Sequence, residues 1–175
     1  MSADALKGKK LGGTNIKEDL FEKNKIFYTM FEPRLQYAWD NGIAIGAYLK
    51  GLKEGKILAS VCTQCNRIMV PTRTFCELCW RTTDRTVEVK DTGTIQTFSI
   101  ARINWDASRL KSGETPTIPA VISLDGASDK MGIMHLIGGV KPEAVKIGMK
   151  VKAVWKQAKD RTGTITDIEY FKPVK

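Results

Sequence analysis

All four cysteines of this chain lie in one short segment, VCTQCNRIMVPTRTFCELCW, where they form two C-x-x-C pairs. Cys62 and Cys65 form the first pair, and Cys76 and Cys79 form the second. Each pair makes a tight knuckle whose two sulfurs reach one ion, and two knuckles complete a tetrahedron with metal–sulfur distances of about 2.3 Å. Because four thiolates leave no open coordination position for a substrate, the spacing predicts a structural zinc site with all four cysteines as ligands.

Two other uses of the same thiols stay open on the sequence alone. Four thiolates also bind iron in rubredoxin-like sites, which would make the chain a redox protein. Either C-x-x-C pair taken alone is typical of a thioredoxin-like dithiol. Zinc is favoured because a dithiol enzyme hardly needs a second pair so near, and nothing else in the sequence indicates electron transfer.

Length and composition suit one domain of ordinary size or two small ones, since 42% of the 175 residues are hydrophobic and 27% are charged. The N-terminal segment has no apolar stretch of the kind found in secretory signals, and no later segment approaches the roughly 20 apolar residues of a membrane span. We therefore expect a soluble cytoplasmic protein with no membrane contact. Reduced thiols in that compartment favour metal binding over disulfides.

The residues offer little for catalysis by this chain alone. If all four cysteines are metal ligands, none is free to act as a nucleophile. The only histidine, His135, lies in the apolar run MGIMHLIGG, which predicts a strand and a half-buried or surface imidazole rather than a general base. No G-x-S-x-G, H-E-x-x-H, P-loop or G-x-G-x-x-G motif is present. The chain is thus not expected to be an enzyme by itself.

The hydrophobic periodicity changes from helical to strand-like at the cysteines. In IAIGAYLKGLKEGKI, apolar Ile45, Leu49 and Leu52 recur at helical spacing and Gly55 supplies a stop, which predicts an amphipathic helix of about three turns. The predicted organisation is an N-terminal arm, a helical segment, a zinc ribbon and a barrel domain. These four parts cover residues 1–34, 35–57, 58–84 and 85–175.

Five strands are expected after the cysteines. The first, TVEVKDTGTIQTFSIARI, is long and interrupted near Gly93, where a bulge or bend is a natural use of glycine. The other four are PAVISLD, MGIMHLI, MKVKAVWKQ and TGTITDIEYF. Before the fourth strand, Pro142 can open a single helical turn that Gly148 closes. A bent first strand and a short helical insert before the fourth predict a mainly β chain with an N-terminal helix and a five-stranded OB-fold barrel.

The order of these motifs resembles a known family. A helix ending in GLKEGKIL, knuckles around a PTR segment, and the strands GTIQTFSI, PAVISLDG and IGMKVKAVW are similar to the zinc-ribbon plus OB-fold family of acyl-CoA-associated accessory proteins. The resemblance covers about residues 35 to 172 and implies a rubredoxin-like zinc ribbon followed by an OB-fold. It also implies a partner, because members of that family pair with thiolase-superfamily enzymes.

The chain departs from the family pattern at the two knuckles. Many members have a double proline where this chain has Pro71 and Thr72, and they tend to place glycine after each cysteine pair. Asn66 follows the first pair and tolerates a left-handed backbone, whereas bulky Trp80 follows the second. We therefore expect the second knuckle to turn differently and Trp80 to pack on the barrel or on a partner.

The net charge of +9 suits a polyanionic ligand, either nucleic acid or the phosphates of coenzyme A. If one region is functional, the long polar connection NWDASRLKSGETPTI is the favoured contact region, because OB-fold loops are where ligands and partners dock; a mobile loop with ordinary charges is the alternative. Phosphate contacts and a stacking face are expected there. The predicted contact residues for acyl-CoA or a partner are Lys50, Lys53, Arg73, Arg102, Trp105, Arg109 and Lys111.

Two functions follow from these observations. The favoured one is a noncatalytic accessory subunit of a hetero-oligomeric complex, in which a thiolase-superfamily partner supplies the nucleophilic cysteine and this chain helps hold the acyl-CoA. The alternative is a zinc-ribbon OB-fold protein that binds single-stranded nucleic acid through a basic groove and stacking aromatics. It is disfavoured because the strands show few paired exposed aromatics, with some of Phe98, Trp155, Tyr170 and Phe171 expected inside.

Overall fold

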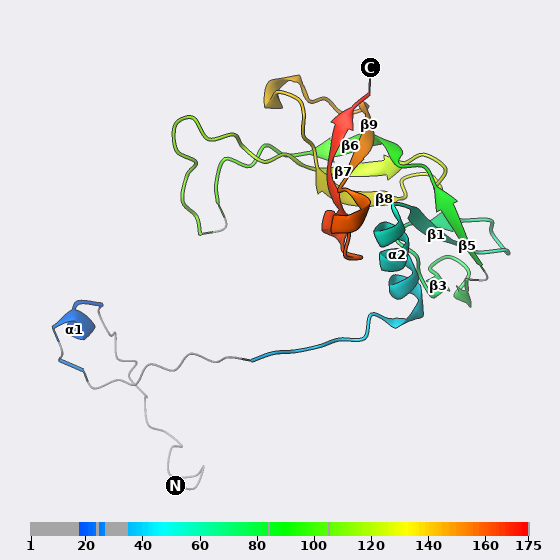
Figure 1. Cartoon of the computed structure of the whole chain (residues 1–175), viewed down its shortest axis with the longest axis horizontal. Helices are drawn as coiled ribbons and strands as arrows, with labels where there is room; N and C mark the ends of the chain where they lie inside the picture. Colours follow the sequence, from blue (N-terminus) through cyan, green and yellow to red (C-terminus); the bar gives the residue numbers. More distant parts are fainter. Residues whose placement is uncertain (1–17, 24, 27–34, 84, 105, 175) are drawn as a thin grey trace, which may run out of the picture. The chain divides into compact units, whose positions relative to one another are not determined.

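The computed structural model describes residues 18–23, 25–26, 35–83, 85–104 and 106–174 (Figure 1). They divide into two units, Met1–Trp39 and Asp40–Lys175. The first unit contains helix α1 (Glu18–Glu22) and a stacked pair of rings, Tyr37 and Trp39, whose centroids lie 6.1 Å apart. Most of the predicted N-terminal arm, residues 1–34, lies outside the described residues.

The second unit begins with helix α2 (Gly42–Glu54), which confirms the predicted amphipathic helix. Its buried face carries Tyr48 and Leu52. The helix ends at Gly55, whose φ of 79° places it in the left-handed region that glycine adopts at low cost. Burial raises the pKa of Tyr48 to about 12, so this phenol is neutral at physiological pH.

Two small sheets follow α2. Strand β1 (Ile57–Val61) pairs antiparallel with both β2 (Ile68–Met69) and β5 (Arg85–Val89), which gives the order β2-β1-β5. Strands β3 (Phe75–Cys76) and β4 (Arg81–Thr82) pair separately as a two-stranded sheet. Cys62 and Cys65 lie in the connection between β1 and β2, Cys76 ends β3, and Cys79 lies in the turn before β4, so this region has the architecture of a zinc ribbon.

A five-stranded antiparallel sheet forms the OB-fold, in the order β10-β9-β6-β7-β8 (Figure 1). The strands are β6 (Thr92–Phe98), β7 (Pro119–Leu124), β8 (Gly132–Leu136), β9 (Lys150–Trp155) and β10 (Ile168–Pro173). Its two edges approach each other just beyond β8, where the N–H of Gly138 donates to the carbonyl of Phe171 at 2.9 Å. The 3-10 turn η2 (Pro142–Ala144) confirms the predicted helical insert before the fourth strand of the barrel.

The predicted interruption of the long first strand is misplaced by two residues. The break falls at Lys90 and Asp91, between β5 and β6, and these two strands belong to different sheets. Gly93 lies inside β6, where a side chain would collide with the backbone carbonyl of Ser123 on β7. Glycine therefore permits close approach of two strands there, and the irregularity of β6 lies further on, between Ile95 and Thr97.

The last predicted strand is correct only in its second half. Residues before β10 form the 3-10 turns η3 (Ala158–Asp160) and η4 (Ile165–Asp167). The fully buried carboxylate of Asp167 holds this region, because it accepts N–H donors from Thr162, Gly163 and Thr164 at 3.0, 2.7 and 3.2 Å. Burial by itself raises the pKa of Asp167, but the three N–H groups more than offset it and lower the pKa below its usual value.

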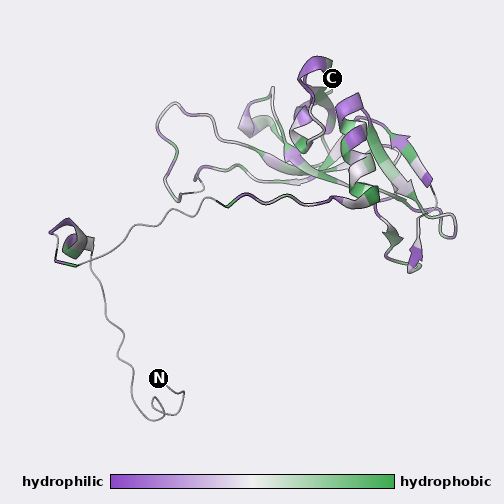
Figure 2. Cartoon of the chain, turned by 60° about the horizontal axis from the view of Figure 1, so that its bottom comes forward, coloured by the Kyte–Doolittle hydropathy of each residue, from purple (hydrophilic) through white to green (hydrophobic). Residues whose placement is uncertain are grey.

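One large hydrophobic core joins α2, β1 and β5 to the strands of the barrel. Its largest fully buried side chains include Phe171, Leu52, Ile57 and Ile122. Hydrophobic and hydrophilic residues follow one another along α2 and the strands (Figure 2). Within the described residues, no helix is long and apolar enough to cross a membrane.

Candidate metal centre

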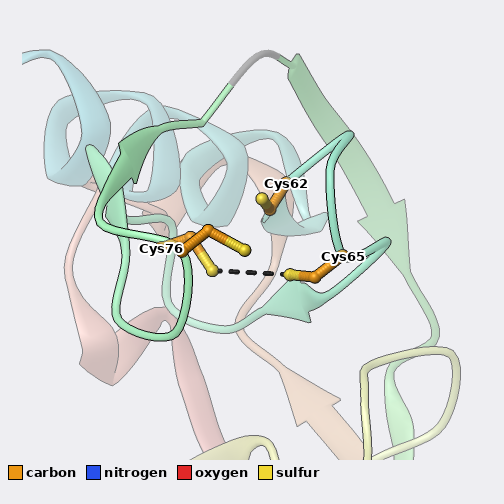
Figure 3. A group of neighbouring side chains, drawn as sticks. Cys62, Cys65 and Cys76 are labelled. Atoms are coloured by element: carbon orange, nitrogen blue, oxygen red, sulfur yellow. Dashed lines mark hydrogen bonds between the residues drawn. The ribbon is translucent and has the colours of Figure 1, made fainter.

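The four cysteine sulfurs converge on one point. The Sγ atoms of Cys62, Cys65, Cys76 and Cys79 all lie within 4.8 Å of one another, and the Sγ atoms of Cys65 and Cys76 are 3.5 Å apart (Figure 3). A regular tetrahedron with zinc–sulfur distances of 2.3 Å separates its sulfurs by about 3.8 Å. The geometry and the all-thiol donor set therefore suit a tetrahedral zinc ion, as the cysteine spacing predicts.

Each knuckle is closed by a backbone hydrogen bond. In the first, between β1 and β2, the N–H of Cys62 donates to the carbonyl of Arg67 at 3.0 Å. In the second, between β3 and β4, the N–H of Trp80 donates to the carbonyl of Cys76 at 2.9 Å. These short strands and turns bring together cysteines that are distant in sequence.

The structure overturns two parts of the expectation for Trp80, the different turn of the second knuckle and packing on the barrel. Its φ of 53° nearly equals the 57° of Asn66, so the second knuckle turns in the same way as the first. Trp80 is 85% exposed and does not pack on the barrel. The tight turn that brings two sulfurs to one ion imposes this backbone on whichever residue follows the pair.

The thiols differ in acidity before any metal is bound. The backbone N–H of Cys65 stabilises the thiolate of Cys62 and lowers its pKa to about 7. A hydrogen bond with Cys65 raises the pKa of Cys79 to about 12. Zinc must therefore displace at least one proton from the cluster at neutral pH, which makes binding pH-dependent.

The metal centre is built partly by the barrel domain. Cys62 and Cys76 are buried in a small cluster with Met69 and with Met131, which precedes β8. Ser128, from the connection between β7 and β8, donates its N–H to the carbonyl of Ile68 at 3.0 Å and accepts the N–H of Ile68 on its Oγ at 2.8 Å. The ribbon and the barrel are therefore joined directly beside the cysteines.

Three predicted contact residues come together outside the metal centre. The connection between β6 and β7 projects from the barrel as a hairpin, held by a bridge between Ile103 and Arg109 (Figure 1). Arg102, Arg109 and Lys111 line one cleft of this hairpin arm. Trp105 lies outside the described residues. The three cations of the arm thus lie around one cleft, in the connection that the sequence favours as a contact region.

The other predicted contact residues lie elsewhere. Arg73 lines a different cleft, between α2 and the ribbon, and its guanidinium lies 3.4 Å from the carboxylate of Glu77. Lys50 and Lys53 are exposed on α2 and line neither cleft. The six predicted contact residues that the structure describes therefore do not form a single site.

Sequence reasoning missed an exposed apolar surface, the barrel face, formed by Pro119, Val121, Met134 and Leu136. The strand register pairs Pro119 with Leu136 and Val121 with Met134 across β7 and β8. Met134 is 72% exposed and Leu136 is 42% exposed, although Ile133 on the same strand is buried inside the barrel. The available signal was the run GIMHL, which is apolar at positions that face both sides of a strand.

The single imidazole has the environment that the sequence predicts. His135 is half-buried, with Nε2 3.2 Å from the carbonyl oxygen of Ile165. Its ring packs edge-on against Phe171 with centroids 5.7 Å apart. These contacts make it part of the packing between β8 and β10.

Comparison with protein families identifies both folded parts of the chain. Residues 49–85 match the model of the ChsH2 rubredoxin-like zinc ribbon domain. Residues 86–156 match the model of the ChsH2 C-terminal OB-fold domain. The two matches are adjacent and confirm the predicted zinc ribbon followed by an OB-fold.

Individual relatives agree with the family models. A DUF35 domain-containing scaffold protein of Methanocaldococcus jannaschii is 31% identical over 127 residues, which cover 70% of this chain and 86% of that protein. A solved DUF35 structure of unknown function from Sulfolobus solfataricus is 29% identical, with a TM-score of 0.52 over 62% of this chain and 75% of that one. A chain from the structure described as Ltp2-ChsH2(DUF35) aldolase has the same fold, with a TM-score of 0.55 and 20% identity, over 79% of this chain and 98% of that one.

Proposed function

This chain belongs to the family of DUF35 domain-containing proteins, and we propose that it is a noncatalytic accessory subunit that binds a thiolase-superfamily enzyme and helps hold its acyl-CoA substrate. An accessory role agrees with the scaffold protein among its relatives and with the aldolase assembly among its structural neighbours. In this proposal Cys62, Cys65, Cys76 and Cys79 are ligands of a structural zinc ion. The thiolase identity of the partner rests on the family resemblance of the motifs.

The observation that carries the proposal is the barrel face. Paired apolar side chains on the outside of β7 and β8 have no role in the core, which lies on the opposite side of these strands. Contiguous exposed apolar side chains of this kind mark surfaces that a partner covers. A protein partner would bury Val121, Met134 and Leu136 and remove them from water.

The chemistry divides between the two subunits. A closed set of four thiols provides structure to this chain and no nucleophile, so bond making and breaking belongs to the partner. This chain contributes positioning and the exclusion of water from the reacting groups. The hairpin arm suits the positioning role, since Arg102, Arg109 and Lys111 lie around one cleft and the phosphates of coenzyme A are anionic.

The test of enzyme binding is affinity purification from the native host at low salt, with metal analysis of the same sample. We expect a thiolase-superfamily enzyme and one zinc ion per chain. Met134→Lys, which places a charge in the barrel face, should release the enzyme, whereas Ile147→Lys at a similarly exposed residue should not. A wild-type chain that instead binds an oligonucleotide in a salt-dependent manner would support the nucleic-acid alternative.

The test of acyl-CoA holding uses the purified complex. Replacing both Arg102 and Arg109 with Ala should weaken acyl-CoA binding on the order of tenfold or more, measured by isothermal titration calorimetry. Lys146→Ala, at an exposed cation outside the arm, is the matched control. Equal affinities for the wild-type and double-variant complexes would remove the arm from the substrate site.

A further inference from the structure

The tip of the second zinc knuckle, residues 75–80, exposes three large hydrophobic side chains. Phe75, Leu78 and Trp80 are 58%, 63% and 85% exposed. The same six residues include Cys76 and Cys79, so two thiols of the metal centre anchor the turn that carries them. This knuckle tip therefore presents apolar side chains on a rigid support.

Trp80 is an unexpected residue for this backbone. A φ of 53° is uncommon for residues other than glycine, asparagine and aspartate, and a bulky aromatic adopts it at a cost. The first knuckle uses Asn66 at the equivalent position, where an asparagine fits the left-handed conformation. Because Trp80 is 85% exposed, burial within this chain does not offset its unfavourable backbone.

The charges around the tip select the kind of partner. The carboxylate of Glu77 pairs with Arg67 at 3.0 Å and with Arg73 at 3.4 Å, so these two cations are locally neutralised. Arg81, next to Trp80, donates to the neutral amide oxygen of Gln64 at 2.6 Å. Within the described residues, no carboxylate forms an ion pair with Arg81. Arg81 is thus a cation beside the tip that no described carboxylate neutralises.

This pattern disfavours two other occupants. A second copy of the chain would bring the same net charge of +9, and like charges repel. A nucleic acid strand follows a continuous basic groove, but Glu77 neutralises two of the arginines near this tip. An apolar pocket with an acidic rim complements Phe75, Trp80 and Arg81 better than either.

We infer that the knuckle tip is a docking site for a folded protein, in which Trp80 enters an apolar pocket and Arg81 faces a carboxylate on its rim. The inference rests on the proposed function, since the enzyme partner is taken as the occupant. Tryptophan and arginine are the residues that most often dominate the affinity of protein interfaces. The metal centre holds the tip in place before binding, so little conformational freedom is lost on docking.

The experiment compares Trp80→Asn with the wild-type chain, using as probe the purified enzyme that copurifies with the wild type. Trp80→Asn copies the residue of the first knuckle and leaves the backbone unstrained. We expect affinity for the enzyme to fall tenfold or more, while the melting temperature and zinc content of the isolated chain do not fall. A structural role for Trp80 would produce the reverse pattern, with lower melting temperature and unchanged affinity, and would overturn the inference.

The charge is tested by Arg81→Glu, which should weaken binding more than Arg81→Gln because it opposes the acidic rim. A photo-crosslinking amino acid at position 80 should attach to the enzyme, and one at exposed position 147 should not. Enzyme that binds Trp80→Asn as tightly as wild type but does not bind Met134→Lys would overturn this inference and leave the proposed function intact. A wild-type chain that captures no enzyme would overturn both, and a dimer that Trp80→Asn abolishes would assign the tip to self-association instead.

Discussion

The zinc ribbon and the barrel are stabilised by different means, although they are adjacent in one chain. Around its cysteines the ribbon has strands of two residues at β2, β3 and β4 and a small buried cluster of Cys62, Met69, Cys76 and Met131, whereas β1 packs in the large core that it shares with the barrel. The barrel has long strands around an extensive aliphatic and aromatic core. A region with so small a core depends on its metal, whereas the barrel depends on apolar burial. This difference gives each region its own weak point.

Metal removal should have the largest effect, and it should be confined mainly to the ribbon. Structural zinc contributes about 10 to 16 kcal/mol in small zinc-finger peptides, far more than the ribbon cluster can supply. We expect chelation, or Cys76→Ser, to abolish amide-exchange protection over residues 62–82 while β6, β7 and β9 keep theirs. Hydrogen exchange with mass spectrometry measures this directly. Uniform loss of protection in both regions would show that the barrel also needs the metal.

The barrel should be most sensitive to loss of a large core side chain. Phe171 is fully buried, so Phe171→Ala should cost about 3 to 5 kcal/mol of unfolding free energy. Phe75→Ala, at a side chain that is 58% exposed in the ribbon, is the matched control and should cost less than about 1 kcal/mol. Urea denaturation of the zinc-loaded variants provides both values. Equal costs for the two variants would show that burial of Phe171 does not stabilise the barrel more than the exposed ring of Phe75 stabilises the ribbon.

Asp167 is a polar anchor within the barrel, and its carboxylate makes the stability of the barrel depend on pH. Asp167→Asn places an amide group among three N–H donors and should cost about 1 to 3 kcal/mol at pH 7. Because the pKa of Asp167 is lower in the folded chain, its contribution is fully present above the unfolded pKa of about 3.9 and is lost as pH falls through the folded value. The difference in urea midpoint between the wild type and Asp167→Asn should therefore be smaller at pH 3 than at pH 7. A difference that is constant with pH would contradict this role.

The smallest effect is expected at the junction of the two regions. Ser128→Ala removes the Oγ that accepts the N–H of Ile68 and should cost about 1 kcal/mol. The variant should increase hydrogen exchange at Ile68 and Met69 without changing the rest of the barrel. Ser112→Ala, on the exposed hairpin arm, serves as its control. Unchanged exchange at Ile68 would show that the ribbon is positioned without this bond.

Local patterns predicted much of the fold and the metal centre. The cysteine spacing predicted the cluster of four thiols, Gly55 predicted the end of α2, and the alternation in MKVKAVW predicted β9. Each of these signals lies within a few residues of the structure that it predicts. The break at Lys90 depends instead on which sheet each half of the strand joins, and this is a tertiary property. The turn before β10 depends on a carboxylate that reaches back to three N–H groups.

The exposed surfaces were the hardest part to predict. Trp80 was expected to avoid the left-handed backbone, but the knuckle geometry fixes that conformation regardless of the side chain. Met134 and Leu136 lie in a mostly apolar run that predicts a strand but not which of its side chains face outward, and only the register across β7 and β8 places them outside. Hydrophobicity in the sequence does not distinguish burial in the core from burial by a partner.

The most direct test of the accessory role is acyl-CoA turnover by the copurified enzyme, measured with this chain, without it, and with this chain alone. We expect no turnover by this chain alone and a higher kcat/KM for the enzyme when the chain is added. Turnover by this chain alone, or an enzyme whose kcat/KM is the same with and without it, would contradict the proposed function.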